Sequence, residues 1–152
     1  MIEVRHTTSD DAETIAMLLN EVDRYYGATE LEPLDTRVAQ IHDFVFTGHA
    51  RPTVLLAHVD GKPAGFASCS LLWPAAVTTR SMYLKELFVV EGARRRGVAR
   101  ALIDDVIAAA RGAGCSRVEW TADADNPAAL EFYRAIGVEI SESKVFYRLP
   151  LT

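Results

Sequence analysis

The sequence predicts a single α/β domain in which helices pack on the faces of one mixed β-sheet. Short runs rich in β-formers alternate with segments whose apolar residues have helical spacing, in the order β-α-α-β-β-β-α-β-α-β. The chain has 152 residues, of which 49% are hydrophobic and 24% charged. These values are typical of a globular chain that buries one core, so residues 1–152 are expected to form one domain.

The first third of the chain predicts one strand and two helices. Residues 2–6 have a strand-like pattern, and Ser9-Asp10-Asp11 is typical of a helix start with acids in the first turn. An apolar stripe continues that helix to about residue 23. Residues 25–33 contain Gly27 and Pro33 and are expected to form a loop, and residues 35–46 a second helix.

The middle of the chain predicts three strands. Residues 53–59 and 64–72 are apolar runs joined by Asp60-Gly61-Lys62, which is typical of a hairpin turn. Trp73-Pro74 ends the second run. The third strand is expected over residues 82–90.

The last third predicts helix, strand, helix and strand. The first helix runs to about residue 110, before Gly112-Ala113-Gly114, and residues 117–122 form the next strand. Asn126-Pro127 supplies a cap and a first-turn proline for a helix over residues 128–136. Residues 144–149 are expected to form the last strand.

The charge balance argues against a nucleic-acid or membrane-surface partner. The chain carries 21 acidic and 16 basic residues, a formal net charge of −5. Six of the basic residues lie between Lys85 and Arg111, so a local anion site is still compatible with the total.

Other composition features predict a soluble, cytoplasmic protein. No signal peptide and no apolar run of about 18 residues is present. Cys69 and Cys115 lack metal-type spacing and are expected to be free, buried thiols, although one disulfide is the alternative. The histidines form no ligand set, so no metal is predicted.

The junction between the third strand and the following helix is the most informative segment. Residues 94–99 are Arg-Arg-Arg-Gly-Val-Ala. The first turn of a helix offers unpaired N–H groups and a favourable dipole to an anion, and a glycine permits close approach. The segment lacks the P-loop and dinucleotide-binding patterns. It therefore predicts a phosphate-bearing ligand, with a solvated basic turn as the alternative.

Two motifs together resemble one enzyme family. Arg-x-x-Gly-x-Ala at residues 94–99, after Leu-Phe-Val, resembles motif A of the GNAT superfamily of acetyl-CoA-dependent N-acetyltransferases. Residues 124–138 resemble motif B of the same superfamily, although Val138 stands where an aromatic residue is usual. The order of elements fits the GNAT fold over nearly the whole chain. The segment before motif A, Tyr-Leu-Lys-Glu-Leu-Phe-Val at residues 83–89, most resembles the diamine and polyamine acetyltransferases. Those enzymes tend to carry an acidic residue at the position of Lys85.

The resemblance implies acetyl-CoA as cofactor and assigns residues to hold it. Backbone groups of Leu87, Phe88 and Val89 would pair with the pantetheine arm like an added strand. The pyrophosphate would be held by the helix start and its basic side chains, namely Arg94, Arg95, Arg96, Gly97, Val98, Ala99 and Arg100, with Arg94 as the main side-chain contact. Asn126 and Ala129 would lie at the cofactor arm, while Asn126 can also serve as a plain helix cap.

The resemblance also implies two catalytic residues. Tyr133 lies seven residues after Asn126 and would donate a proton to the departing thiolate; core packing is its alternative role. Glu86 would act as the base toward the amine, directly or through water, with an exposed strand glutamate as the alternative.

The acceptor amine is expected near the loop after the first helix. Acids and tyrosines there could receive an ammonium group, and Trp73 could form a wall of the same pocket; the residues are Asp23, Tyr25, Tyr26, Glu30, Glu32 and Trp73. A solvated acidic loop and a packing role for Trp73 are the alternatives.

These residues predict transfer of an acetyl group from acetyl-CoA to a small-molecule primary amine in a ternary complex. A protein N-terminal or lysine acetyltransferase and a non-catalytic acyl-CoA sensor are the alternative functions. Homodimers are frequent in the family, and a homodimer is expected on that ground alone.

Overall fold

The computed structural model describes residues 1–151, and the chain falls into two compact units, Met1–Trp120 and a second that starts at Thr121. The first unit contains a five-stranded sheet in the order β1-β2-β3-β4-β5. Its strands are β1 (Ile2–His6), β2 (Thr53–Val59), β3 (Lys62–Leu72), β4 (Arg80–Val89) and β5 (Cys115–Glu119). All neighbours are antiparallel except β4 and β5, which are parallel, so the predicted mixed sheet is confirmed.

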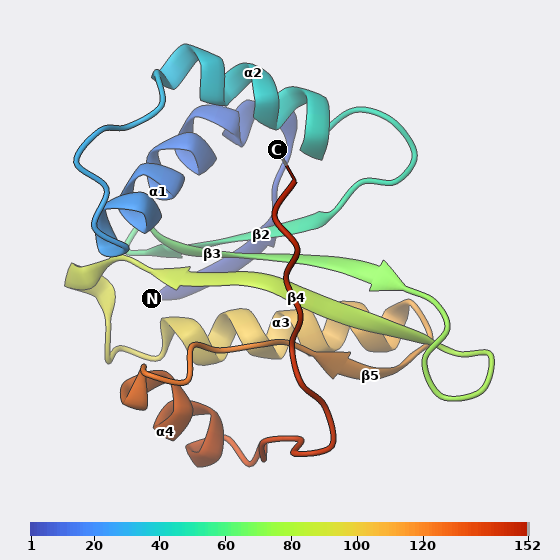
Figure 1. The fold of residues 1–152 in the computed structure, drawn as a ribbon. Coiled ribbons are helices and arrows are strands. Elements are labelled where there is room, and N and C mark those ends of the chain that lie inside the picture. The colour runs from blue at the N-terminus through green and yellow to red at the C-terminus, as the bar shows by residue number, and fades with distance from the viewer. Residues whose placement is uncertain (152) are drawn as a thin grey trace. The chain divides into compact units, whose positions relative to one another are not determined.

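Helices cover both faces of this sheet, as predicted (Figure 1). The helices α1 (Ala12–Tyr25) and α2 (Leu34–Val45) pack on one face, and α3 (Val98–Gly112) packs on the other. Each face of the sheet has its own hydrophobic core, and successive strand residues point to opposite faces. Leu55 and Ala67 lie in the core on the α3 side, and Leu56 and Phe66 lie in the core on the α1 side. Burial of apolar side chains therefore holds the helices on each face of the sheet.

The second unit contains one helix, α4 (Pro127–Ala135), close to the predicted range. The expected strand over residues 144–149 is wrong, because the structure assigns no strand to the described residues after Glu119. The apolar side chains of that segment are exposed, Val145 at 75% and Tyr147 at 87%. Apolar residues alone do not make a strand, which needs hydrogen bonds to a neighbouring strand.

Other differences are shifts of element ends. β3, β4 and β5 each begin two residues before their predicted starts, and β5 ends at Glu119 rather than residue 122. No helix among the described residues is long and apolar enough to cross a membrane.

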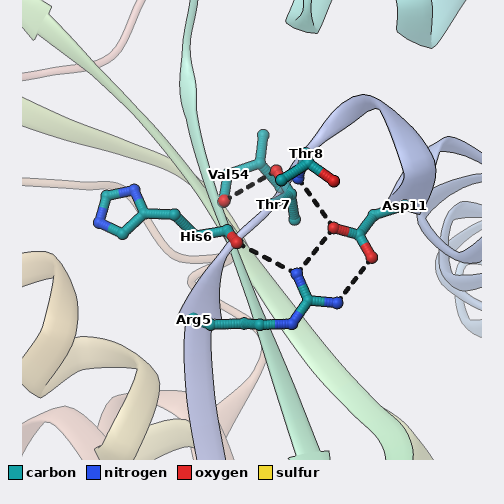
Figure 2. A network of polar contacts seen from close by, with 6 residues as sticks. All are labelled: Arg5, His6, Thr7, Thr8, Asp11 and Val54. Carbon is teal, nitrogen blue, oxygen red and sulfur yellow. Dashed lines mark hydrogen bonds and ion pairs between the residues drawn. The ribbon is translucent and has the colours of Figure 1, made fainter.

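A polar network joins β1 to the start of α1 (Figure 2). The guanidinium of Arg5 donates to both carboxylate oxygens of Asp11, at 2.8 and 2.7 Å, and the Thr8 amide donates to Oδ2 at 2.8 Å. Asp11 is only 8% exposed. The Arg5 hydrogen bonds lower the pKa of Asp11 against the opposing effect of burial, and the Thr8 amide lowers it further.

We expect Asp11→Asn to destabilise the fold by about 2 kcal/mol at pH 7, because it removes a charged hydrogen-bonded pair from a buried position. The lowered pKa means that the carboxylate stabilises the fold above its ordinary value of 3.8 and loses this contribution as pH falls through the lower pKa of the folded state. Urea denaturation should therefore show a difference from the parent that shrinks below about pH 4. Asp10→Asn, on the exposed neighbour, is the control; an equal loss for both variants would contradict the role of Asp11.

Candidate functional site

The edge of β4 that faces β5 is open over half its length. β4 pairs with β5 only over residues 80–83, whereas it pairs with β3 as far as Val89. Within the first unit, residues 84–89 therefore have a strand neighbour on one side only. Leu87, Phe88 and Val89, the residues expected to pair with an extended ligand, lie in this open segment.

A bulge at Lys85 sets the direction of Glu86. Ser68 pairs with Glu86 and Cys69 with Leu84, so Lys85 is an extra residue on β4. Before the bulge, Leu84 packs into the core on the α3 side; after it, Phe88 packs into the core on the α1 side. Glu86 lies two residues before Phe88 and so belongs to the α1 side of the sheet, half-buried. The helix α1 packs on this same side of the sheet.

Gly65 permits the close approach of β3 to the end of β4. It pairs with Val89, and a Cβ at this position would collide with the backbone carbonyl oxygen of Phe88. The path of the open β4 segment thus depends on the missing side chain of Gly65.

We expect Gly65→Ala to destabilise the fold by about 2 to 3 kcal/mol, because a backbone clash inside a sheet cannot be relieved by a side-chain rotation. Thermal unfolding measures this effect. The control is Gly92→Ala, since a Cβ there would meet nothing within 4 Å. Equal melting temperatures for parent and Gly65→Ala would contradict the assigned tight contact.

The loop between β4 and α3 alternates in the handedness of its backbone. A short 3-10 helix, η2 (Glu91–Ala93), leads into residues 94–97, and α3 then begins at Val98. Arg95 (φ 62°) and Gly97 (φ 86°) have left-handed backbone, while Arg96 between them does not. Alternation of this kind is typical of loops whose successive N–H groups face one anion, which makes this amide loop a candidate anion site. The predicted helix start with a glycine before it is confirmed.

The arginine side chains of this loop have different partners. Arg94 Nε donates to the Val89 carbonyl at 3.0 Å. Arg96 lies 3.8 Å from Asp60, and Arg100 pairs with Asp104 at 3.1 Å. Two of the arginines thus already face acidic groups, which leaves the backbone amides, Arg94 and the exposed Arg95 as the main candidates for an anion.

The C-terminal end of α1 meets this loop through Tyr25. The Arg94 guanidinium lies 5.1 Å from the Tyr25 ring centre and 5.7 Å from that of Phe88. The Tyr25 ring also contacts Tyr26, with centroids 5.1 Å apart, and Phe88, with centroids 6.3 Å apart. Tyr25, expected to contact an acceptor, is thus placed against residues expected to hold the cofactor.

The acidic residues predicted to bind the acceptor have mixed surroundings. The Arg37 guanidinium of α2 donates to a carboxylate oxygen of Asp23 at 2.6 Å, and the two side chains form an ion pair. Glu30 is exposed. Glu32 has one buried carboxylate oxygen for which the described residues supply no hydrogen-bond partner. The pairing of Asp23 with Arg37 was invisible in the sequence, because the two residues lie on different helices.

Trp73 lies at the other end of the sheet from Arg94. Leu72, before it, pairs with Ser81 at the start of β4, whereas Arg94 follows Val89 at its end. Val89 lies eight residues after Ser81 along β4, which corresponds to about 26 Å of strand. Trp73 is 67% exposed and donates to the Thr78 carbonyl at 3.1 Å. The β3–β4 register thus places Trp73 at the opposite end of β4 from Arg94, which Tyr25 contacts, and the part of Trp73 in the acceptor pocket stays a prediction.

In the second unit, Asn126 and Tyr133 lie at the two ends of α4. The Asn126 side chain accepts from the Ala129 amide at 3.2 Å, so its role as a helix cap is confirmed. Tyr133 is half-buried, and its ring centroid lies 5.3 Å from that of Phe132. The seven-residue spacing puts Asn126 and Tyr133 on one side of the helix.

Both cysteines are free thiols, as expected. Cys69 is fully buried, and burial raises its pKa to about 11. Cys115 is half-buried rather than buried, which corrects the expectation for that residue. A raised pKa keeps the Cys69 thiol protonated and unsuited to act as a nucleophile.

Comparison with known families decides the classification. The model of the Acetyltransferase (GNAT) family matches residues 15–138, which cover both motifs and most of the fold. The chain belongs to the GNAT family.

Known members of this family resemble the chain in sequence. An aminoglycoside N(6')-acetyltransferase type 1 from Klebsiella aerogenes is 34% identical over 119 residues, which cover 74% of this chain and 77% of the relative. An uncharacterized N-acetyltransferase of Methanocaldococcus jannaschii is 35% identical over 88 residues, covering 57% of this chain and only 39% of that longer protein.

Solved structures share the GNAT fold. An integron cassette protein from the mobile metagenome of Vibrio cholerae has a TM-score of 0.89 at 28% identity, covering 98% of this chain and 92% of its own. An aminoglycoside N-acetyltransferase in complex with CoA has a TM-score of 0.79 at 23% identity, covering 99% and 96%. The predicted α/β GNAT fold is confirmed.

Proposed function

We propose that this GNAT member transfers the acetyl group of acetyl-CoA to a primary amine of a small molecule, by direct attack in a ternary complex. The observation that carries the proposal is the open edge of β4 at residues 84–89, which leads directly into the amide loop before α3. An extended arm with amide groups fits the edge, and a pyrophosphate fits the loop. Coenzyme A has both parts in this order, and a structural neighbour carries CoA.

Leu87, Phe88 and Val89 would then bind the pantetheine arm through their backbone. The pyrophosphate would rest on the amides of residues 95–100, where Gly97 leaves room for it, and Arg94 would add charge. Asn126 and Ala129 are proposed contacts of the cofactor arm. When bound, the cofactor supplies an activated acetyl thioester.

The amine must lose a proton before its nitrogen can attack the thioester carbonyl. Glu86 is proposed to take this proton, directly or through water, because the Lys85 bulge places it on the face of the sheet that α1 covers. The proposed acceptor loop, residues 26–33, directly follows α1. The Tyr133 hydroxyl is proposed to protonate the departing thiolate. Attack by the free amine would displace the thiolate, and the products would be an amide and free coenzyme A.

A small cationic acceptor is supported by the acids of the loop after α1 and by the aminoglycoside acetyltransferase among the relatives. Asp23, Tyr26 and Glu30 are the proposed acceptor contacts. A single functional domain over residues 1–152, a cytoplasmic location and a homodimer stay predictions.

The test is thiol release from acetyl-CoA with a panel of aminoglycosides, diamines and amino acids, with acetylated product identified by mass spectrometry. We expect release that depends on both enzyme and amine. Tight CoA binding without turnover across the panel would overturn the proposal in favour of a sensor. Acetylation of peptide amines only would overturn the small-molecule assignment.

A further inference from the structure

We infer that Tyr25 is a positioning residue for the cofactor site, which it serves by holding the Arg94 guanidinium in place, and that it is not an acceptor contact. This inference rests on the proposed function, since it takes coenzyme A as the ligand of the Arg94 loop. It changes the role expected for Tyr25 from the sequence.

Arg94 contacts three groups of the first unit. Its Nε donates to the Val89 carbonyl at 3.0 Å, and its guanidinium lies 5.1 Å from the Tyr25 ring centre and 5.7 Å from that of Phe88. Phe88 is buried, at 8% exposure, and therefore forms a fixed wall. Tyr25 is 50% exposed and forms the other aromatic contact.

This arrangement keeps the charge of Arg94 while restricting its motion. An aromatic face attracts a guanidinium, and the attraction leaves the outer N–H groups available for phosphate oxygens. Among residues 1–151, no acidic side chain lies within ion-pair distance of Arg94, in contrast to Arg96 and Arg100. An ordered, uncompensated guanidinium binds an anion at a smaller entropic cost than a mobile one.

Tyr25 also lies next to the proposed acceptor loop. It is the last residue of α1, and the loop begins at Tyr26, whose ring contacts that of Tyr25. One side chain therefore contacts both Arg94 and the first residue of the acceptor loop.

Binding of CoA by calorimetry to the full-length parent, Tyr25→Phe and Tyr25→Leu tests the inference. We expect Tyr25→Leu to raise the Kd for CoA about fivefold, the size of one partly exposed cation–π contact, and Tyr25→Phe to keep the parent value. ADP, which carries a pyrophosphate, should show the same loss, whereas pantetheine should show none. Phe44→Leu, at a 73% exposed ring of α2, is the matched control and should bind CoA like the parent.

A double-mutant cycle with Arg94→Met adds a readout that a general loss of fold would not give. Methionine removes the cation that contacts the Tyr25 ring, so Tyr25→Leu should have little further effect in the Arg94→Met background. Additive losses, or a Tyr25→Leu variant with unchanged CoA affinity and a raised acceptor KM, would overturn the inference. A parent protein that fails to bind CoA would instead overturn the proposed function itself.

Discussion

Tyr133→Phe is expected to lower kcat about 100-fold while leaving the KM for acetyl-CoA nearly unchanged. The substitution removes only the hydroxyl that would protonate the leaving thiolate, and general acid catalysis contributes at least this much. The phenyl ring that remains can keep the contact with Phe132, whose centroid lies 5.3 Å away, so the fold of α4 should persist. Steady-state kinetics with saturating amine measures the effect.

The matched control for this variant is Tyr147→Phe. Tyr147 lies in the same unit and is 87% exposed, so loss of its hydroxyl should leave kcat unchanged. Circular dichroism of both variants checks that the helix content is retained. An undiminished kcat in Tyr133→Phe would remove this residue from the mechanism.

Glu86→Gln is expected to lower kcat/KM for the amine by about 100-fold at pH 7, because the amide of glutamine cannot accept the ammonium proton. The loss should shrink as the pH rises toward the pKa of the free amine, roughly 10, since the amine then arrives already deprotonated. This pH dependence separates a lost base from a misplaced strand, which would lower the rate at every pH.

Glu142→Gln is the control for Glu86→Gln, as Glu142 is an exposed glutamate outside the proposed site. It should reproduce the parent profile from neutral to alkaline pH. A Glu86→Gln defect that stays constant over this range would contradict the role of Glu86 as base.

Local features of the fold were predictable because their causes are local. The ranges of β1 and β2 agree with the structure, and Asn126-Pro127 begins α4 as its cap and proline predict. The glycine before α3 has the left-handed backbone that its position in the motif favours.

Features that depend on distant residues were not predictable from local pattern. Apolar residues at 144–149 resemble a strand, yet strand formation depends on a hydrogen-bonded neighbour that no local pattern identifies. The same limit applies to Trp73, which the β3–β4 register separates from Arg94.

Two properties of the candidate site also required the structure. The Lys85 bulge changes the face to which Glu86 belongs, and a run of strand-forming residues gives no sign of it. The contact of Tyr25 with Arg94 joins residues 69 positions apart, and only the return of the chain from α1 through β4 brings them together.

The central claim is acetyl transfer from acetyl-CoA to an amine by direct attack. The most direct measurement is the initial rate of thiol release while acetyl-CoA and an accepted amine are varied together, with the acetylated amine counted in parallel. The account predicts one acetylated amine per thiol released and intersecting double-reciprocal lines. Thiol release without an acetylated amine, or parallel lines from an acetyl-enzyme intermediate, would contradict it.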